Sequence, residues 1–448
     1  MNILLLFLKI LCLWFTGYFL LHFFIKTNTY HKYLFAFPMG IGVVALIDLF
    51  LRISFSQYHF KILNLFIIFS SLSGILSFIK NAKNFKVPKK DIIFAWICIT
   101  LFGLFLLFRS LIMPIEAWDS IAIHTLKVKK LTYQSDFTQY FGIPEYANPH
   151  QDYPILIHLT ESWLAKDGFS ENWQDYPVKS LSPICACLII LLIYHRMRKD
   201  YNSIIAFLCS IAFGLCPIVL EYAVVNLMDL PLCLFFVITL LALEQYDESK
   251  KMEWLSLALT FAIMSAFIKN EGIPFLLITL FFVATRIVKI QKNIQWNIQT
   301  KIGILIALLC FLFWIEWLLL LLINGVRESN IIKDNINLLN LISFERYKII
   351  FVSIVTQIFD FKRWGLILLT TFLGGLVGLK IKHNVYAQYF VSMIVVLVFA
   401  YGITSENLVW HLNTSLDRTL LQISGLGFLS FFVLFSRKSD KVNCDITF

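Results

Sequence analysis

The chain has 448 residues, of which 59% are hydrophobic and 15% charged, and its mean hydropathy is +0.76. Soluble domains are about 45–50% apolar and about 25% charged, and a single core stops growing near about 250–300 residues. The apolar surplus must therefore face lipid, which excludes a soluble enzyme, a disordered chain and a nucleic-acid-binding protein. The net charge of +10 is then evidence about membrane topology.

Thirteen apolar segments are candidates for membrane-spanning helices, which need about 20 mostly apolar residues. They cover residues 3–25, 33–51, 62–79, 92–111, 178–195, 203–220, 227–243, 254–268, 273–288, 302–323, 364–379, 385–403 and 420–436. The first segment lacks a basic leader and a small-residue cleavage site, so we expect it to be retained. The sequence thus predicts an all-α integral membrane protein with about 13 transmembrane helices.

Lysine and arginine gather in alternate connections between these segments, from the third connection onward, and again after the last segment. The basic clusters lie at residues 80–90, 196–199, 250–251, 286–301, 380–382 and 437–441. The positive-inside rule makes this side cytoplasmic. We therefore expect a multi-pass protein of the plasma membrane with its N-terminus outside, its C-terminus in the cytoplasm, and two long outer loops at 112–177 and 324–363.

The first outer loop begins with a short amphipathic segment at residues 120–130. Apolar residues recur there at i, i+4 and i+7, while His124 and Lys127 share the polar face. This spacing predicts a helix that lies in the membrane interface. Asp119 precedes it, and two interpretations stay open: a helix N-cap, for which Asp is among the best residues, or a functional carboxylate at the membrane surface.

The same loop continues with a polar turn and a second amphipathic segment at residues 154–165, which predicts another interfacial helix. His150 and Asp152 in the turn have a spacing compatible with metal ligation. Since no third ligand accompanies them, we favour a hydrogen-bonded turn.

Further polar residues reach the outer side at the ends of later segments. Asp229 opens the seventh segment, Lys269 and Glu271 join the eighth to the ninth, and His411 and Arg418 lie in the last outer loop. Each has an ordinary explanation, such as a snorkelling pair at 269 and 271 or a lipid headgroup at Arg418. All of these residues nevertheless fall on the predicted outer side. Because that side is assigned from lysines elsewhere in the chain, the agreement favours a shared site.

The segments themselves are nearly free of charge, with Lys9 and Glu316 as the main exceptions. A transporter would be expected to place ionisable residues at mid-membrane depth, often on broken helices in two repeated halves. No internal repeat is evident. We expect three extra helices in residues 1–90, one transmembrane catalytic domain in 91–436, and a cytoplasmic tail in 437–448.

Together these motifs resemble bacterial members of the GT-C glycosyltransferase superfamily, grouped with the dolichyl-phosphate-mannose protein mannosyltransferases of glycosyltransferase family 39. The resemblance rests on Trp118-Asp119 and the His-Gln-Asp-Tyr-Pro-Ile-Leu run at 150–156, then on Asp229-Leu230-Pro231, residues 269–272 and residues 410–418, in that order. It covers roughly residues 91–436. The usual His-Pro-Asp-Tyr-Pro has Gln151 in place of the first proline.

The resemblance implies an enzyme that transfers a sugar from a polyprenyl-phosphate donor to a lipid, glycan or protein acceptor on the outer face, without nucleic acid. By position, Asp119 is the catalytic base. The candidates for binding the donor phosphate are Lys127, Lys129, Lys269 and Arg418. The candidates for positioning substrate are Glu116, His124, His150, Asp152, Tyr153, Asp229, Glu271 and His411. A divalent cation is left open, and the alternative function is a flippase, a polymerase-type protein or a transporter without glycosyl transfer.

Overall fold

The computed structural model describes residues 3–25, 30–82, 89–134, 136–143, 150–166, 173–290, 297–326, 342–381 and 384–436. Within these ranges the chain forms helices and no strand. The elements are α1 (Ile3–Phe24), α2 (Tyr30–Phe55), α3 (His59–Ala82), α4 (Lys90–Ile112), the π-helix η1 (Ser120–Thr125), α5 (Leu126–Tyr133), α6 (Phe137–Phe141), α7 (Leu156–Ala165), α8 (Leu181–Met197), α9 (Ser203–Gly214), α10 (Pro217–Tyr222), α11 (Asp229–Ser249), α12 (Met252–Ala266), α13 (Gly272–Ile290), α14 (Ile298–Ile323), α16 (Phe344–Ile358), α17 (Phe361–Trp364), α18 (Ile367–Gly378), α19 (Val385–Ile403) and α20 (Leu408–Phe435). The tail 437–448, with its basic cluster, lies outside the described residues.

Each of the thirteen apolar segments is helical, twelve of them within one main helix and the segment 203–220 within two, which confirms the all-α membrane fold. Among the described residues, eight helices are long and apolar enough to cross a membrane: α1, α2, α3, α4, α11, α14, α19 and α20. The other five, α8, α9, α12, α13 and α18, are apolar but shorter. The number of spans therefore stays a prediction.

Three expected boundaries differ in the structure. The segment 203–220 breaks into α9 and α10, because Pro217 at the start of α10 cannot continue the preceding helix. The loop expected at 324–363 contains α16 and α17, and α16 packs against α19 and α20. The last outer loop is also helical, since α20 begins at Leu408, where the side chain of Asn407 accepts a hydrogen bond from the backbone N–H of Trp410.

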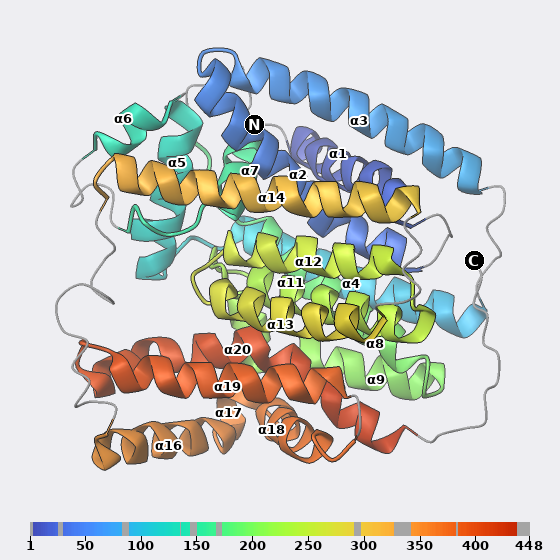
Figure 1. Ribbon diagram of the computed structural model, residues 1–448, viewed down its shortest axis with the longest axis vertical. Helices are drawn as coiled ribbons and strands as arrows, with labels where there is room; N and C mark the ends of the chain where they lie inside the picture. Colours follow the sequence, from blue (N-terminus) through green and yellow to red (C-terminus); the bar gives the residue numbers. More distant parts are fainter. Residues whose placement is uncertain are drawn as a thin grey trace.

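The long helices run side by side in three groups (Figure 1). Helices α1–α3 and α14 lie along the top of that view, α4, α8, α9 and α11–α13 form the middle, and α16–α20 lie along the bottom. Helices α5 and α6 lie together at the left-hand end of the long helices (Figure 1). Both helices predicted in the first outer loop are present, as η1 continuing into α5 and as α7. We refer to η1, α5 and α7 as the outer helices, after the outer loop in which the sequence predicts them.

Helices α1 and α2 cross in backbone contact. A Cβ atom added to Gly17 would lie 1.7 Å from the carbonyl oxygen of Ala36, and one added to Gly40 would lie 1.9 Å from that of Leu13. Any larger side chain would force the helices apart. Small residues give close helix packing in lipid, where helix association lacks the hydrophobic driving force available in water.

Candidate active site

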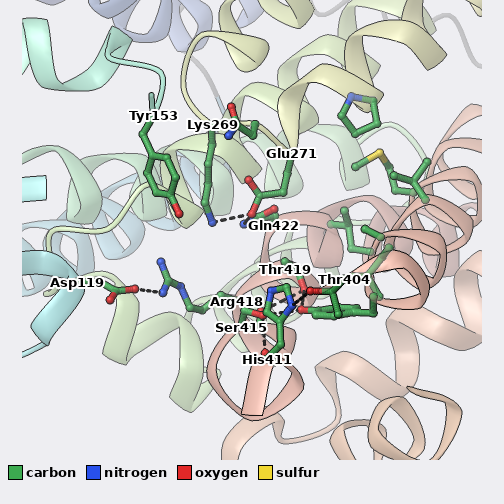
Figure 2. A pocket seen from close by; sticks show the side chains of 18 of the residues that line it. Asp119, Tyr153, Lys269, Glu271, Thr404, His411, Ser415, Arg418, Thr419 and Gln422 are labelled. Carbon is green, nitrogen blue, oxygen red and sulfur yellow. Dashed lines mark hydrogen bonds and ion pairs between the residues drawn. The ribbon is translucent and has the colours of Figure 1, made fainter. Parts of the chain in front are cut away.

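A cavity of about 380 Å³ opens where the N-terminus of η1, the α12–α13 connection, α19 and α20 meet (Figure 2). Its polar wall includes Asp119, Lys269, Glu271 and Arg418. These four residues come from three distant parts of the sequence, and the fold brings them to one place. The volume falls within the range of about 300–1,000 Å³ that is usual for small-molecule sites.

Arg418 on α20 joins two carboxylates. Its Nη1 atom forms an ion pair with Asp119 Oδ2, and its Nε atom lies 3.4 Å from Asp229 Oδ2. Asp119 does not cap η1, since its backbone is already helical and its side chain makes no capping hydrogen bond. The N-cap interpretation is therefore wrong for this structure, and the carboxylate faces the cavity instead (Figure 2).

Lys269 makes the second half of the polar wall. Its Nζ atom lies 3.0 Å from Asp229 Oδ1 and 2.8 Å from Glu271 Oε1. Gln422 Nε2 donates to Asp229 Oδ1 at 2.7 Å. Burial lowers the pKa of Lys269, but Asp229 and Glu271 outweigh that effect and the net pKa is raised. With a side chain only 12% exposed, Lys269 is a fixed internal cation and not a surface snorkelling residue.

We call Asp119, Asp229, Lys269, Glu271 and Arg418 the charged cluster. It holds three carboxylates and two cations, so an incoming phosphate must take a cation from a carboxylate. The side chain of Asp229 is fully enclosed, whereas those of Asp119 and Glu271 are each 32% exposed. The latter two are therefore the partners that an anion can displace.

The rest of the cavity is neutral. His411 Nδ1 lies 3.0 Å from Thr404 Oγ1, and the hydroxyl of Tyr401 lies 2.8 Å from Ser415 Oγ. The apolar wall consists of Pro274 on α13, Met393, Val396, Leu397 and Ala400 on α19, and Ile423 on α20. A phosphate with an apolar tail matches this combination of a charged cluster beside an apolar wall.

The other two predicted phosphate ligands do not line the cavity. Lys127 is buried, donates to the carbonyl oxygen of His150 at 2.7 Å and lies 5.4 Å from the ring centroid of Tyr153. Burial lowers the pKa of Lys127 to about 7. Lys129 is exposed, with its Nζ atom 5.9 Å from the Trp173 ring centroid.

The predicted substrate-positioning residues divide in the same way. His124, Tyr153, Glu271 and His411 line the cavity, whereas Glu116, His150, Asp152 and Asp229 do not. Glu116 is exposed, Asp152 is buried, and Asp229 lies behind the polar wall. No three His, Cys, Asp or Glu side chains are grouped so that they could hold a metal ion, within the part of the chain that the structure describes.

His124 is fixed by a residue that the sequence analysis did not single out. Its Nδ1 atom lies 3.0 Å from Nε2 of His158 on α7, and both rings are buried. Burial holds the pKa of both imidazoles well below the ordinary range, so the pair is neutral at pH 7.

Four lining residues of α20 were also missed: Ser415, Thr419, Gln422 and Ile423. With His411 they lie at i, i+4, i+8, i+11 and i+12. This spacing is the available signal, because residues three and four apart share one face of a helix. It was not used because residues 408–419 were expected to be a loop.

Comparisons with known proteins agree on one class. A family model described as dolichyl-phosphate-mannose-protein mannosyltransferase matches residues 169–317, which include Asp229, Lys269 and Glu271 but neither Asp119 nor Arg418. The crystal structure of ArnT from Cupriavidus metallidurans bound to undecaprenyl phosphate is similar, with a TM-score of 0.50 and 14% sequence identity. The match covers 76% of this chain and 60% of the ArnT chain. No curated protein sequence matches this chain.

The chain therefore has an ArnT-like fold, and the two comparisons together support a resemblance to the GT-C class of polytopic membrane glycosyltransferases. Within that class, the chain resembles glycosyltransferase family 39.

Proposed function

We propose that this chain is a membrane glycosyltransferase that moves a sugar from a polyprenyl-phosphate donor to an acceptor on the outer face of the plasma membrane. The observation that carries the proposal is the convergence of Asp119, Lys269 and Arg418 on one cavity with an apolar wall. The undecaprenyl phosphate bound to ArnT is a ligand of the kind that such a cavity fits, because it has an anionic head on a long apolar chain. Sugar nucleotides are made in the cytoplasm, so an enzyme that works outside needs a lipid-linked donor.

In this proposal, the donor phosphate binds Arg418 and Lys269, and its polyprenyl chain follows the apolar wall. Asp119 accepts the proton of the acceptor hydroxyl while that oxygen attacks the anomeric carbon. The bond between that carbon and the phosphate oxygen breaks, and polyprenyl phosphate leaves with one more negative charge than the phosphate carried in the donor. The two cations stabilise this developing charge, which is usually the largest catalytic contribution.

The ion pair between Arg418 and Asp119 has a direct consequence for this reaction. While Arg418 is paired with Asp119, the guanidinium occupies lone pairs of the carboxylate. The same lone pairs must accept the proton of the acceptor hydroxyl. Donor phosphate that takes Arg418 releases Asp119. We therefore propose that the donor binds before the base becomes active.

The test is a transfer assay with the purified full-length chain in nanodiscs and a panel of polyprenyl-phosphate sugars. We expect Asp119→Asn to retain normal protein levels and to lose about 10²–10⁴-fold in turnover, the usual contribution of a general base. Full activity of Asp119→Asn would exclude Asp119 as the base. Movement of lipid-linked sugar between leaflets without transfer would instead support the flippase or transport alternative.

The orientation is a separate part of the proposal. Single cysteines introduced into a chain from which the native cysteines have been removed can be labelled from the outside of intact cells. Labelling after residue 116 but not near residue 250 would agree with an outer active site, and the reverse pattern would exclude it.

A further inference from the structure

Each of the three N-terminal helices makes a polar contact with α7. From α1, Lys9 Nζ donates to the backbone carbonyl oxygens of Trp163 at 2.8 Å and Leu164 at 3.2 Å, and also to that of Lys166. These carbonyls belong to the last turn of α7 and the residue after it, where a helix leaves its acceptors unpaired. A cation at a helix C-terminus is also favoured by the helix dipole. These contacts explain why Lys9 is present in an otherwise apolar segment.

Helices α2 and α3 also make hydrogen bonds with α7. Thr160 Oγ1 donates to the carbonyl oxygen of Ile41 on α2 at 3.0 Å. Trp163 Nε1 donates to Asn64 Oδ1 on α3 at 2.8 Å. The contact between α2 and α7 is also extensive.

Arg52 near the end of α2 links two of the outer helices at once. Its Nε atom lies 2.8 Å from Asp48 Oδ2, and both side chains are buried. The Nη1 atom donates to the carbonyl oxygen of Gln134, directly after α5, at 2.8 Å, and Nη2 donates to Ser162 Oγ on α7 at 3.2 Å. A buried guanidinium needs partners for its donors, and Arg52 finds them on α2 itself, on the residue after α5 and on α7.

These contacts reach the charged cluster through one helical run. Asp119 directly precedes η1, and η1 continues without a break through α5 to Tyr133. At about 1.5 Å per residue this run is about 20 Å long. Arg52 holds its far end, and the pair of His124 and His158 ties its near half to α7.

We infer that α1–α3 form a platform that fixes the helix bearing Asp119, and that Arg52 and Lys9 are positioning residues for the reaction. The inference rests on the proposed function for its catalytic consequence, but its structural part does not. The matched family segment begins at residue 169, so nothing in that match accounts for these three helices.

The experiment compares Arg52→Gln, Arg52→Lys and Lys9→Met in the full-length chain. Arg52→Lys keeps the charge beside Asp48 but loses the fork that reaches Gln134 and Ser162. Arg286→Gln is the matched control. It removes a guanidinium whose Nη2 atom lies 2.6 Å from Asp247 Oδ2, and this pair lies far from the outer helices. Lys9→Met decides the question if both Arg52 variants fail to fold.

The first measurement is hydrogen–deuterium exchange. In the Arg52 variants we expect amide exchange in 126–133 and 156–165 to accelerate about fivefold, as loss of one buried hydrogen bond implies. In Lys9→Met we expect this in 156–165 alone. Exchange in α20 should stay unchanged in all of them, and Arg286→Gln should leave the outer helices unchanged. Unchanged exchange in the outer helices of all three variants would overturn the platform.

The second measurement separates kcat from the KM for the donor. The platform positions Asp119 but not Lys269 or Arg418, so we expect kcat to fall about 10- to 100-fold with an unchanged or lower KM. Accelerated exchange with unchanged kcat would overturn the positioning role. If the wild-type chain transferred no sugar from any donor, the proposed function would fail while the exchange experiment still decided the platform.

Discussion

Replacing Asp119 with Asn should strengthen the binding of undecaprenyl phosphate while it lowers turnover about 10²–10⁴-fold. Asp119 is the partly exposed competitor for Arg418, and Asn has the same shape without the charge. In this variant the phosphate would bind an Arg418 guanidinium that pairs with the enclosed Asp229 and no longer with residue 119. Most active-site substitutions weaken binding, so an increase is a specific signature of competition.

The size of the effect follows from the exposure of the pair. Hydrogen bonds between charged groups contribute about 1.5–3 kcal/mol when buried, and exposed ion pairs about 0–1 kcal/mol. The side chains of Arg418 and Asp119 are 16% and 32% exposed, which places the pair between these limits. A competition of about 1 kcal/mol corresponds to a Kd about fivefold lower.

Binding can be measured by isothermal titration of the protein in nanodiscs with undecaprenyl phosphate. Glu271→Gln should act in the same direction, because it removes the exposed carboxylate from Lys269. Asp247→Asn is the control, since that carboxylate pairs with Arg286 at the other end of α11. A Kd for Asp119→Asn equal to or above the wild-type value would refute the competition.

Three further outcomes are expected. Arg418→Lys keeps the charge but loses the forked contact, so donor affinity should fall about tenfold in the same titration, and unchanged affinity would speak against a bidentate contact. Burial lowers the pKa of Lys127 to about 7 in the folded chain, whereas an unfolded lysine has a pKa near about 10.4, so the unfolded chain binds more protons in that window. Wild-type thermal stability should therefore rise relative to Lys127→Met between pH 7 and about pH 10, and parallel melting curves at all pH values would contradict this. Burial raises the pKa of the Glu161 carboxyl well above its usual range, so the folded chain loses stability as pH rises. Glu161→Gln should therefore melt at or above the wild-type temperature at pH 7, and the difference between the two melting temperatures should widen at higher pH. A melting temperature several degrees below wild type would show that the carboxylate is needed.

The sequence was sufficient to predict that Asp119, Lys269 and Arg418 lie on one side of the bundle of apolar segments, and in the structure all three line one cavity. Lysine positions assigned that side, and each of the three residues lies at or near the end of an apolar segment. Periodicity similarly located the two outer helices. What it could not supply was the pairing within the charged cluster, because Asp119 and Arg418 lie 299 residues apart.

Local composition predicts a loop at the start of α20, where the structure has a helix. The run from Trp410 to Arg418 is rich in Asn, Thr, Ser and Asp, which have low helix propensity and favour loops. Packing of Leu412 and Leu416 in the core overrides that preference, and both are buried. The role of Lys9 was equally invisible, since its acceptors on α7 are more than 150 residues away.

The close crossing of α1 and α2 bears on how the protein is made. Helices of a nascent chain appear in order, and N-terminal units fold first. The platform can thus assemble around Gly17 and Gly40 before the ribosome has added α7, which then docks onto a surface already in place. A bulky residue at Gly17 would disturb that surface during synthesis. A change in the first helix should therefore alter the position of the Asp119 carboxylate, which is translated long afterwards.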